Sequence, residues 1–166
     1  WGHDFRPDYT ALSLLAHRFK GIPRIALTAT ADQATRKDIV ERLELADGKT
    51  FVGGFDRPNI HYSILERNNP KKQVYDFIKN HHAGDSGIIY CISRKKVEDM
   101  ADWLQGKGIN ALPYHAGLNP ETRSKNQDRF LREDNIIIVA TIAFGMGIDK
   151  PDVRYVAHMN IPKSIE

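Results

Sequence analysis

The chain has 166 residues, of which 41% are hydrophobic and 27% charged, the usage of an ordinary folded domain. No apolar run approaches the roughly 20 residues that a transmembrane helix needs, and a single cysteine, Cys91, excludes both an internal disulfide framework and a metal site made of cysteines alone. The 24 lysines and arginines against 21 aspartates and glutamates give a net charge of +3, which permits a polyanionic partner without requiring one.

The first 50 residues predict a loop, a helix, a strand and a second helix. Apolar residues recur at helical spacing over residues 12–19, and a short apolar strand is predicted over 24–28. Thr30-x-x-Gln33 has the pattern of a capping box, so we expect the second helix to begin there. Glycines and a proline then make residues 47–59 rich in turns, which predicts a domain boundary near residue 50.

Residues 51–166 predict a regular alternation of strands and helices. Strands are expected where apolar residues run together, at 60–65, 87–91, 109–114, 136–140 and 153–158. Helices are expected after capping residues, beginning at Pro70, after Ser93 and at Pro120. Strands that alternate with helices in this way indicate βαβ units, hence an α/β fold whose parallel sheet has helices on both faces.

In such sheets the functional groups lie in the loops that leave the carboxyl ends of the strands. This rule selects residues 28–30, 93–94, 115–117 and 141–150. The last loop has two glycines that free the backbone to approach a phosphate or sugar. In it Asp149 can accept ribose hydroxyls, and Thr141 or Lys150 can meet a phosphate; a glycine-rich turn with a surface ion pair is the alternative.

Two familiar phosphate motifs fail on spacing. Gly48-Lys49-Thr50 looks like the end of a P-loop, but the pattern requires a glycine where Leu43 stands. Gly145-x-Gly147 begins like a dinucleotide fingerprint, but Lys150 stands in place of the third glycine. The seven histidines do not have metal-ligand spacings, and no Asp-Glu dipeptide occurs, so no metal site is predicted. Aromatic residues beside an arginine in residues 1–7 suit stacking on unpaired bases, although a packed loop is the alternative.

Taken in chain order, several segments resemble those of a RecQ-family DNA helicase of superfamily 2. The segments are WGHDFRPDY (1–9), ALTATA (26–31), FDRPNI (55–60), GIIYCISRKKVE (87–98), YHAGL (114–118) and ATIAFGMGIDKPD (140–152). The resemblance implies a RecA-like parallel sheet, the helicase C-terminal domain, over residues 51–166. It also implies a partial RecA-like domain over residues 1–50.

The resemblance also implies an activity, which is ATP-dependent unwinding of duplex or branched DNA in the three-prime to five-prime direction, in repair and recombination. ATP and Mg²⁺ are the implied cofactors of the full-length parent, and single-stranded and duplex DNA are the implied partners, with no membrane. The implied location is the cytoplasm, associated with the nucleoid, in a bacterium, or the nucleus in a eukaryote.

Site residues follow by the same resemblance, position by position. Those implied to couple DNA contact to hydrolysis are Trp1, His3, Phe5, Arg6, Thr28 and Thr30. Those implied to contact nucleic acid are Ser93, Arg94, His115 and Thr141. Those implied to face the nucleotide are Gly147, Asp149 and Lys150.

The sequence departs from the family pattern in what it lacks. It contains no P-loop, no acidic metal-binding motif, no adenine-reading glutamine and no arginine-bearing motif VI. We therefore expect a piece of a longer helicase that is inactive alone, in which residues 1–50 lack sheet partners. A non-catalytic nucleic-acid-binding module with a RecA-like fold and an RNA helicase remain alternatives, and a nucleotide-binding Rossmann enzyme is a third.

Overall fold

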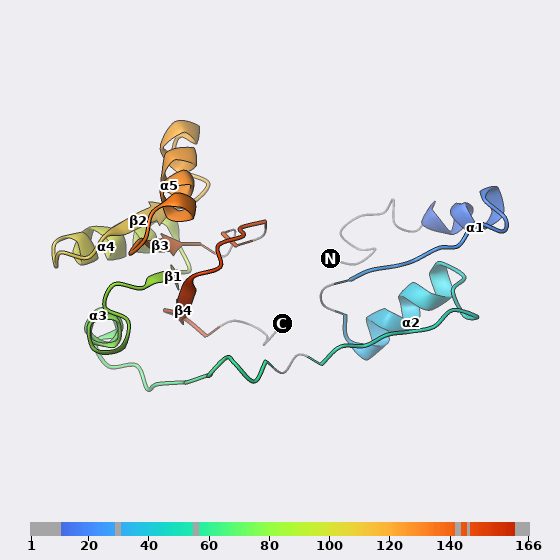
Figure 1. Cartoon of the computed structure of the whole chain (residues 1–166), viewed down its shortest axis with the longest axis horizontal. Helices are drawn as coiled ribbons and strands as arrows, with labels where there is room; N and C mark the ends of the chain where they lie inside the picture. Colours follow the sequence, from blue (N-terminus) through green and yellow to red (C-terminus); the bar gives the residue numbers. More distant parts are fainter. Residues whose placement is uncertain (1–10, 29–30, 55–56, 142–143, 146, 162–166) are drawn as a thin grey trace. The chain divides into compact units, whose positions relative to one another are not determined.

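A computed structural model of the chain describes residues 11–28, 31–54, 57–141, 144–145 and 147–161 (Figure 1). The chain divides into two compact units, residues 1–62 and residues 63–165, and each is described by itself. The division near residue 50 stays a prediction. No helix among the described residues is long and apolar enough to cross a membrane.

In the described part of the first unit there are two helices, α1 (Leu14–Arg18) and α2 (Gln33–Arg42). The N-cap of α2 is Asp32, whose carboxylate accepts a hydrogen bond from the Thr35 N–H at 2.6 Å. This bond is the main cause that lowers the pKa of Asp32 below its ordinary value. The predicted Thr30–Gln33 capping box is therefore wrong, because an aspartate one residue before the helix takes the cap; Thr30 itself lies outside the described residues.

The strands predicted over 24–28 and 60–65 are also wrong, because neither segment belongs to a strand in the structure. Ile25 and Leu27 are 83% and 85% exposed. A strand is stabilised by the ladder that it forms with a neighbour, and the described residues of this unit contain no strand to pair with. The segment is held instead by Arg24, whose guanidinium donates to the backbone oxygens of Leu43 and Glu44 at 2.7 and 3.1 Å.

The second unit alternates helices and strands as predicted. Its elements are α3 (Pro70–His81), β1 (Ser86–Tyr90), α4 (Arg94–Gln105), β2 (Ala111–Tyr114), α5 (Pro120–Arg132), β3 (Ile137–Ala140) and β4 (Val153–His158). Each helix begins at a side-chain cap: Asn69, Ser93 and Asn119 accept hydrogen bonds from the backbone N–H three residues on. The predicted starts of all three helices are confirmed, because these caps satisfy amides that the first turn leaves unpaired.

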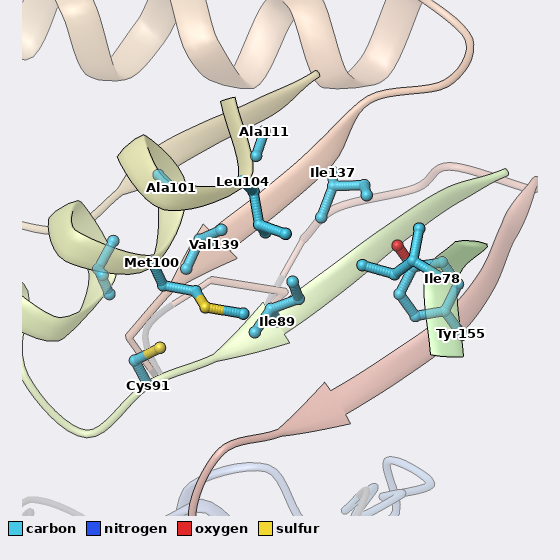
Figure 2. Packing of buried hydrophobic residues seen from close by; sticks show 11 residues of the cluster. Ile78, Ile89, Cys91, Met100, Ala101, Leu104, Ala111, Ile137, Val139 and Tyr155 are labelled. Carbon is cyan, nitrogen blue, oxygen red and sulfur yellow. The ribbon is translucent and has the colours of Figure 1, made fainter. Parts of the chain in front are cut away.

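The four strands form one parallel sheet in the order β2-β3-β1-β4. In β3, Ile137 and Val139 face α3 and α4, whereas Ile138 and Ala140 face α5. Figure 2 shows the first of these layers, in which Met100 and Leu104 of α4 lie over the sheet. Burial on both faces accounts for the continuous apolar run of β3, and the predicted α/β fold with a parallel sheet is confirmed.

Candidate functional site at the carboxyl edge of the sheet

The parallel arrangement brings the loops after β1, β2 and β3 to one edge of the sheet. Backbone bonding continues past the strand ends, since Cys91 N–H donates to Ala140 O at 2.8 Å and Thr141 N–H to Tyr114 O at 3.4 Å. Three of the four predicted segments, 93–94, 115–117 and 141–150, therefore leave the sheet side by side. The fourth, residues 28–30, belongs to the other unit.

Ser93 and Arg94 lie at this edge, where α4 begins. Ser93 is exposed, and its hydroxyl oxygen accepts from the Lys96 N–H at 3.4 Å, which leaves the hydroxyl proton available for a ligand. Arg94 is exposed at the first position of the helix. Its guanidinium has no hydrogen bond or ion pair with any residue that the structure describes. The planar fork of an arginine suits the two oxygens of a phosphate.

His115, which follows β2, is 3% exposed and has both ring nitrogens engaged. Nδ1 lies 3.1 Å from the Gly117 amide nitrogen, and Nε2 lies 3.1 Å from Oε1 of Glu98 on α4. A ring in this setting reaches nucleic acid only if the loop changes, so the predicted direct contact stays a prediction. What the structure shows is a buried link between the loop after β2 and helix α4.

Gly117 is packed against Arg94. A Cβ atom at position 117 would lie 3.0 Å from Arg94 Cδ, 3.1 Å from Nη1 and 3.2 Å from His115 Nδ1. These separations are shorter than ordinary van der Waals contact, so a larger residue at position 117 would push the arginine or the imidazole aside by a few tenths of an ångström. The predicted residues Arg94 and His115 are thus brought together through a glycine between them.

The glycine-rich loop after β3 is tied to β1 by Tyr90. The hydroxyl of Tyr90 donates to the Phe144 carbonyl oxygen at 2.7 Å, and burial raises the pKa of that hydroxyl. Gly145 has φ +117°, and a Cβ there would lie 2.9 Å from the Tyr90 hydroxyl oxygen. The Phe144 ring is buried against Tyr114 and Phe130. The first half of the loop is therefore anchored to the core.

The second half of this loop presents its predicted residues differently. Gly147 and Asp149 are exposed, and the space around the Cα of Gly147, which has φ +78°, is open. Thr141 is half-buried, and its carbonyl accepts from the Phe144 N–H at 3.2 Å. An exposed backbone and an exposed carboxylate are groups that a nucleotide sugar or phosphate can approach.

Lys150 points into the protein instead. Its side chain is 4% exposed, and its ammonium lies 3.2 Å from Glu133 O, 3.0 Å from the Asp152 carboxylate and 5.5 Å from the centre of the Phe130 ring. The hydrogen bond from Lys150 is the first cause that lowers the pKa of Asp152. Its predicted place beside the nucleotide stays a prediction, because the structure shows its charge already neutralised.

The residues predicted to couple DNA contact to hydrolysis belong to the first unit. Thr28 is exposed in the first unit, and Trp1, His3, Phe5, Arg6 and Thr30 lie outside the described residues. No group of three histidine, cysteine or acidic side chains in the described parts is placed to hold a metal ion. The described residues on this edge therefore offer no such cluster to Mg²⁺.

Two contributors to the edge, Glu98 and Tyr90, were not predicted, whereas Gly117 lies in the predicted segment 115–117. Glu98 matters only through a contact that joins separate elements, so nothing in its local sequence distinguishes it. Tyr90 carried a weak signal, since a hydroxyl-bearing aromatic residue ends an otherwise apolar strand. Such a hydroxyl needs a partner when it is partly buried.

Comparison with known proteins identifies the family to which the chain is similar. The family described as helicase conserved C-terminal domain matches residues 69–166. Over its whole length the chain is 49% identical to the RecQ-like DNA helicase BLM of Xenopus laevis, covering 12% of that protein. It is 51% identical to the ATP-dependent DNA helicase RecQ of Pasteurella multocida, covering 26%. It is 47% identical to the ATP-dependent DNA helicase hus2/rqh1 of Schizosaccharomyces pombe, covering 13%. The chain thus spans about an eighth to a quarter of the length of these relatives.

Proposed function

The chain belongs to the family of helicase conserved C-terminal domains, of the RecQ type, and on that premise we propose that it serves in an ATP-dependent DNA helicase. In this role it provides the second RecA-like motor domain of an enzyme that unwinds duplex or branched DNA with three-prime to five-prime polarity. Repair and recombination are the processes that such an activity serves. The observation that carries the proposal is the convergence of Arg94 and two further loops on one edge of a parallel sheet.

DNA contact at this edge is electrostatic and independent of base sequence. The Arg94 guanidinium can donate two hydrogen bonds to a phosphate, and the Ser93 hydroxyl can donate one more. Contacts to phosphates carry no information about the bases, so a motor that uses them can move along any sequence. Each phosphate that the protein neutralises releases counterions, so binding should weaken as salt rises.

The nucleotide is proposed to approach the exposed half of the loop after β3. Asp149 can accept hydrogen bonds from ribose hydroxyls, and the open backbone at Gly147 allows close approach. ATP supplies the free energy of the motor by hydrolysis. No ligands for Mg²⁺ are assigned to this chain.

Hydrolysis itself needs groups that this sequence does not contain, since no GxxxxGK[ST] pattern occurs in it. We expect the 166-residue chain to release no phosphate from ATP above background, with or without single-stranded DNA. A phosphate-release assay on the purified chain measures this. DNA-stimulated turnover would refute the expectation.

The test of DNA binding is fluorescence anisotropy of a dye-labelled single-stranded oligothymidine, titrated with the chain at several salt concentrations. We expect Arg94→Ala to weaken binding about tenfold and to flatten the salt dependence, because one charge-assisted contact is lost. The matched control is Arg132→Ala. Arg132 is exposed at the last position of α5, a helix that leads into the amino end of β3.

Equal losses in the Arg94 and Arg132 variants would refute a DNA site at this edge, since they would report net charge alone. An RNA strand that competes better than the DNA strand would favour an RNA helicase instead.

A further inference from the structure

His115 is buried in a chain of hydrogen bonds whose direction the geometry fixes. The Gly117 amide can only donate, so Nδ1 of His115 must be the acceptor across their 3.1 Å contact. A neutral imidazole then carries its proton on Nε2, which faces the Glu98 carboxylate at 3.1 Å. The hydrogen bonds therefore run from the Gly117 N–H through the imidazole to Glu98.

These hydrogen bonds close a tight loop after β2. The Leu118 N–H donates to the His115 carbonyl at 3.1 Å, so the amides of both Gly117 and Leu118 are bonded to His115. Glu98 lies one helical turn beyond Arg94 on α4. Because residues four apart lie on the same side of a helix, the link to Glu98 holds the loop against the part of α4 that carries Arg94.

The loop in turn shapes the position of Arg94. The Arg94 side chain occupies the space where a Cβ of residue 117 would stand, at 3.0 and 3.1 Å. Any shift of Gly117 away from His115 removes the surface against which the arginine packs. The guanidinium itself has no hydrogen bond or ion pair among the described residues, so packing alone sets where it lies.

We propose that His115, bonded to Glu98, is a positioning residue that fixes Gly117 and thereby holds the Arg94 guanidinium ready for a phosphate of the nucleic acid. This rests on the proposed function for the ligand, but the positioning itself is a property of the free protein. It replaces direct contact by His115 with an action through Arg94. It also gives Glu98 and Gly117 a role in nucleic-acid binding.

Two isosteric substitutions separate the bonds of the imidazole. His115→Asn retains an acceptor near Nδ1, and His115→Gln retains a donor near Nε2. We expect His115→Asn to lose about twofold in affinity for the oligothymidine, because it can hold Gly117 but loses the bond to Glu98. We expect His115→Gln to lose about fivefold, because it cannot hold Gly117. Gly117→Ala presses on Arg94 directly and should lose part of the affinity that Arg94→Ala loses. Its φ lies outside the positive range, so its backbone tolerates alanine.

Double variants distinguish positioning from general damage. If His115 acts through Arg94, then His115→Gln and Gly117→Ala lower affinity no further in a chain that already carries Arg94→Ala. Equal losses in the presence and absence of Arg94 would overturn the proposal. So would wild-type affinity in both His115→Gln and Gly117→Ala, provided that circular dichroism shows both folded.

A spectroscopic measurement on the free chain keeps the proposal separate from DNA binding. The ¹⁵N shifts of the His115 ring should show a neutral imidazole protonated at Nε2, and a nuclear Overhauser effect should connect Gly117 Hα with Arg94 Hδ. A ring protonated at Nδ1, or loss of that effect in His115→Asn, would overturn the positioning role. A wild-type chain with the expected tautomer that fails to bind DNA would instead refute the proposed function.

Discussion

Removal of the Tyr90 hydroxyl tests whether the anchor of the glycine-rich loop is energetically important. Tyr90→Phe deletes the donor to Phe144 O, which lies at 2.7 Å, and changes no other heavy atom. A lost hydrogen bond costs about 1 kcal/mol, and a buried carbonyl left without a donor costs about 1–3 kcal/mol. Phe144 is 3% exposed, but Tyr90 is only half-buried, so water can replace part of the bond. We expect a loss of about 1.5 kcal/mol in the free energy of unfolding.

Urea unfolding followed by circular dichroism measures this loss, with Tyr75→Phe as the matched control. The Tyr75 hydroxyl has no hydrogen bond among the described residues, and its ring packs edge-on against Trp103. The control should therefore change stability by less than about 0.5 kcal/mol. Equal stabilities of the two variants would refute the reasoning that the Tyr90 hydroxyl anchors the loop.

The wild type and Tyr90→Phe should also differ in how their stability responds to alkaline pH. Burial raises the pKa of Tyr90 above its ordinary value of 10.0, so the unfolded chain loses this proton first as pH rises. The stability that the hydroxyl contributes is complete below pH 10 and is lost as pH rises through the folded-state pKa. The advantage of the wild type over Tyr90→Phe should shrink above pH 10. An advantage that grew there would contradict the burial argument.

Further predictions concern packing and acid sensitivity. Gly87→Ala places a Cβ 2.2 Å from the Tyr155 ring, so overpacking should lower the free energy of unfolding by about 1–3 kcal/mol. The control Gly106→Ala, whose Cβ would lie 3.5 Å from its nearest neighbours, should be tolerated. Urea unfolding compares the two variants, and equal losses would contradict the packing argument. His158 is exposed but stacks on Tyr90 at 5.1 Å between ring centres, and the partial desolvation of its ring lowers its pKa below 6.5. Stability should therefore fall as pH drops below 6.5, because the unfolded chain takes the proton first, and His158→Gln should lessen that fall; an identical pH profile in the variant would count against it.

The sheet of the second unit could be predicted because its signals are local. Asn69, Ser93 and Asn119 cap helices through atoms within three residues of themselves, so sequence spacing alone identifies them. The apolar run of β3 is likewise readable, since both faces of a central parallel strand are buried. The described residues of the first unit include no strand that could pair with the segment around Ile25 and Leu27. Apolar residues do not form a strand by themselves.

Sequence alone could not show the contacts that join distant elements around the predicted site residues. Lys150 follows two glycines and so looked available to a phosphate, but its ammonium lies beside Glu133 O, which belongs to the turn after α5. His115 looked like a ligand-binding polar residue, but the carboxylate of Glu98, which lies 17 residues earlier, accepts a hydrogen bond from its ring. Burial and pairing across such separations depend on how the helices pack on the sheet, and no local pattern records that.

The anchored and open halves of the glycine-rich loop have different consequences for binding. Phe144 is fixed by the Tyr90 hydroxyl and by two aromatic neighbours, so this point of the loop is held before a ligand arrives. Holding this point lowers the conformational entropy that binding costs. Because Gly145 and Gly147 have positive φ, the chain can turn away from this anchor and still leave Asp149 exposed. A side chain at Gly145 would break the anchor by meeting Tyr90, whereas one at Gly147 would meet open space but strain the backbone. The two glycines are therefore required for different reasons, and alanine at each should weaken nucleotide binding through different steps.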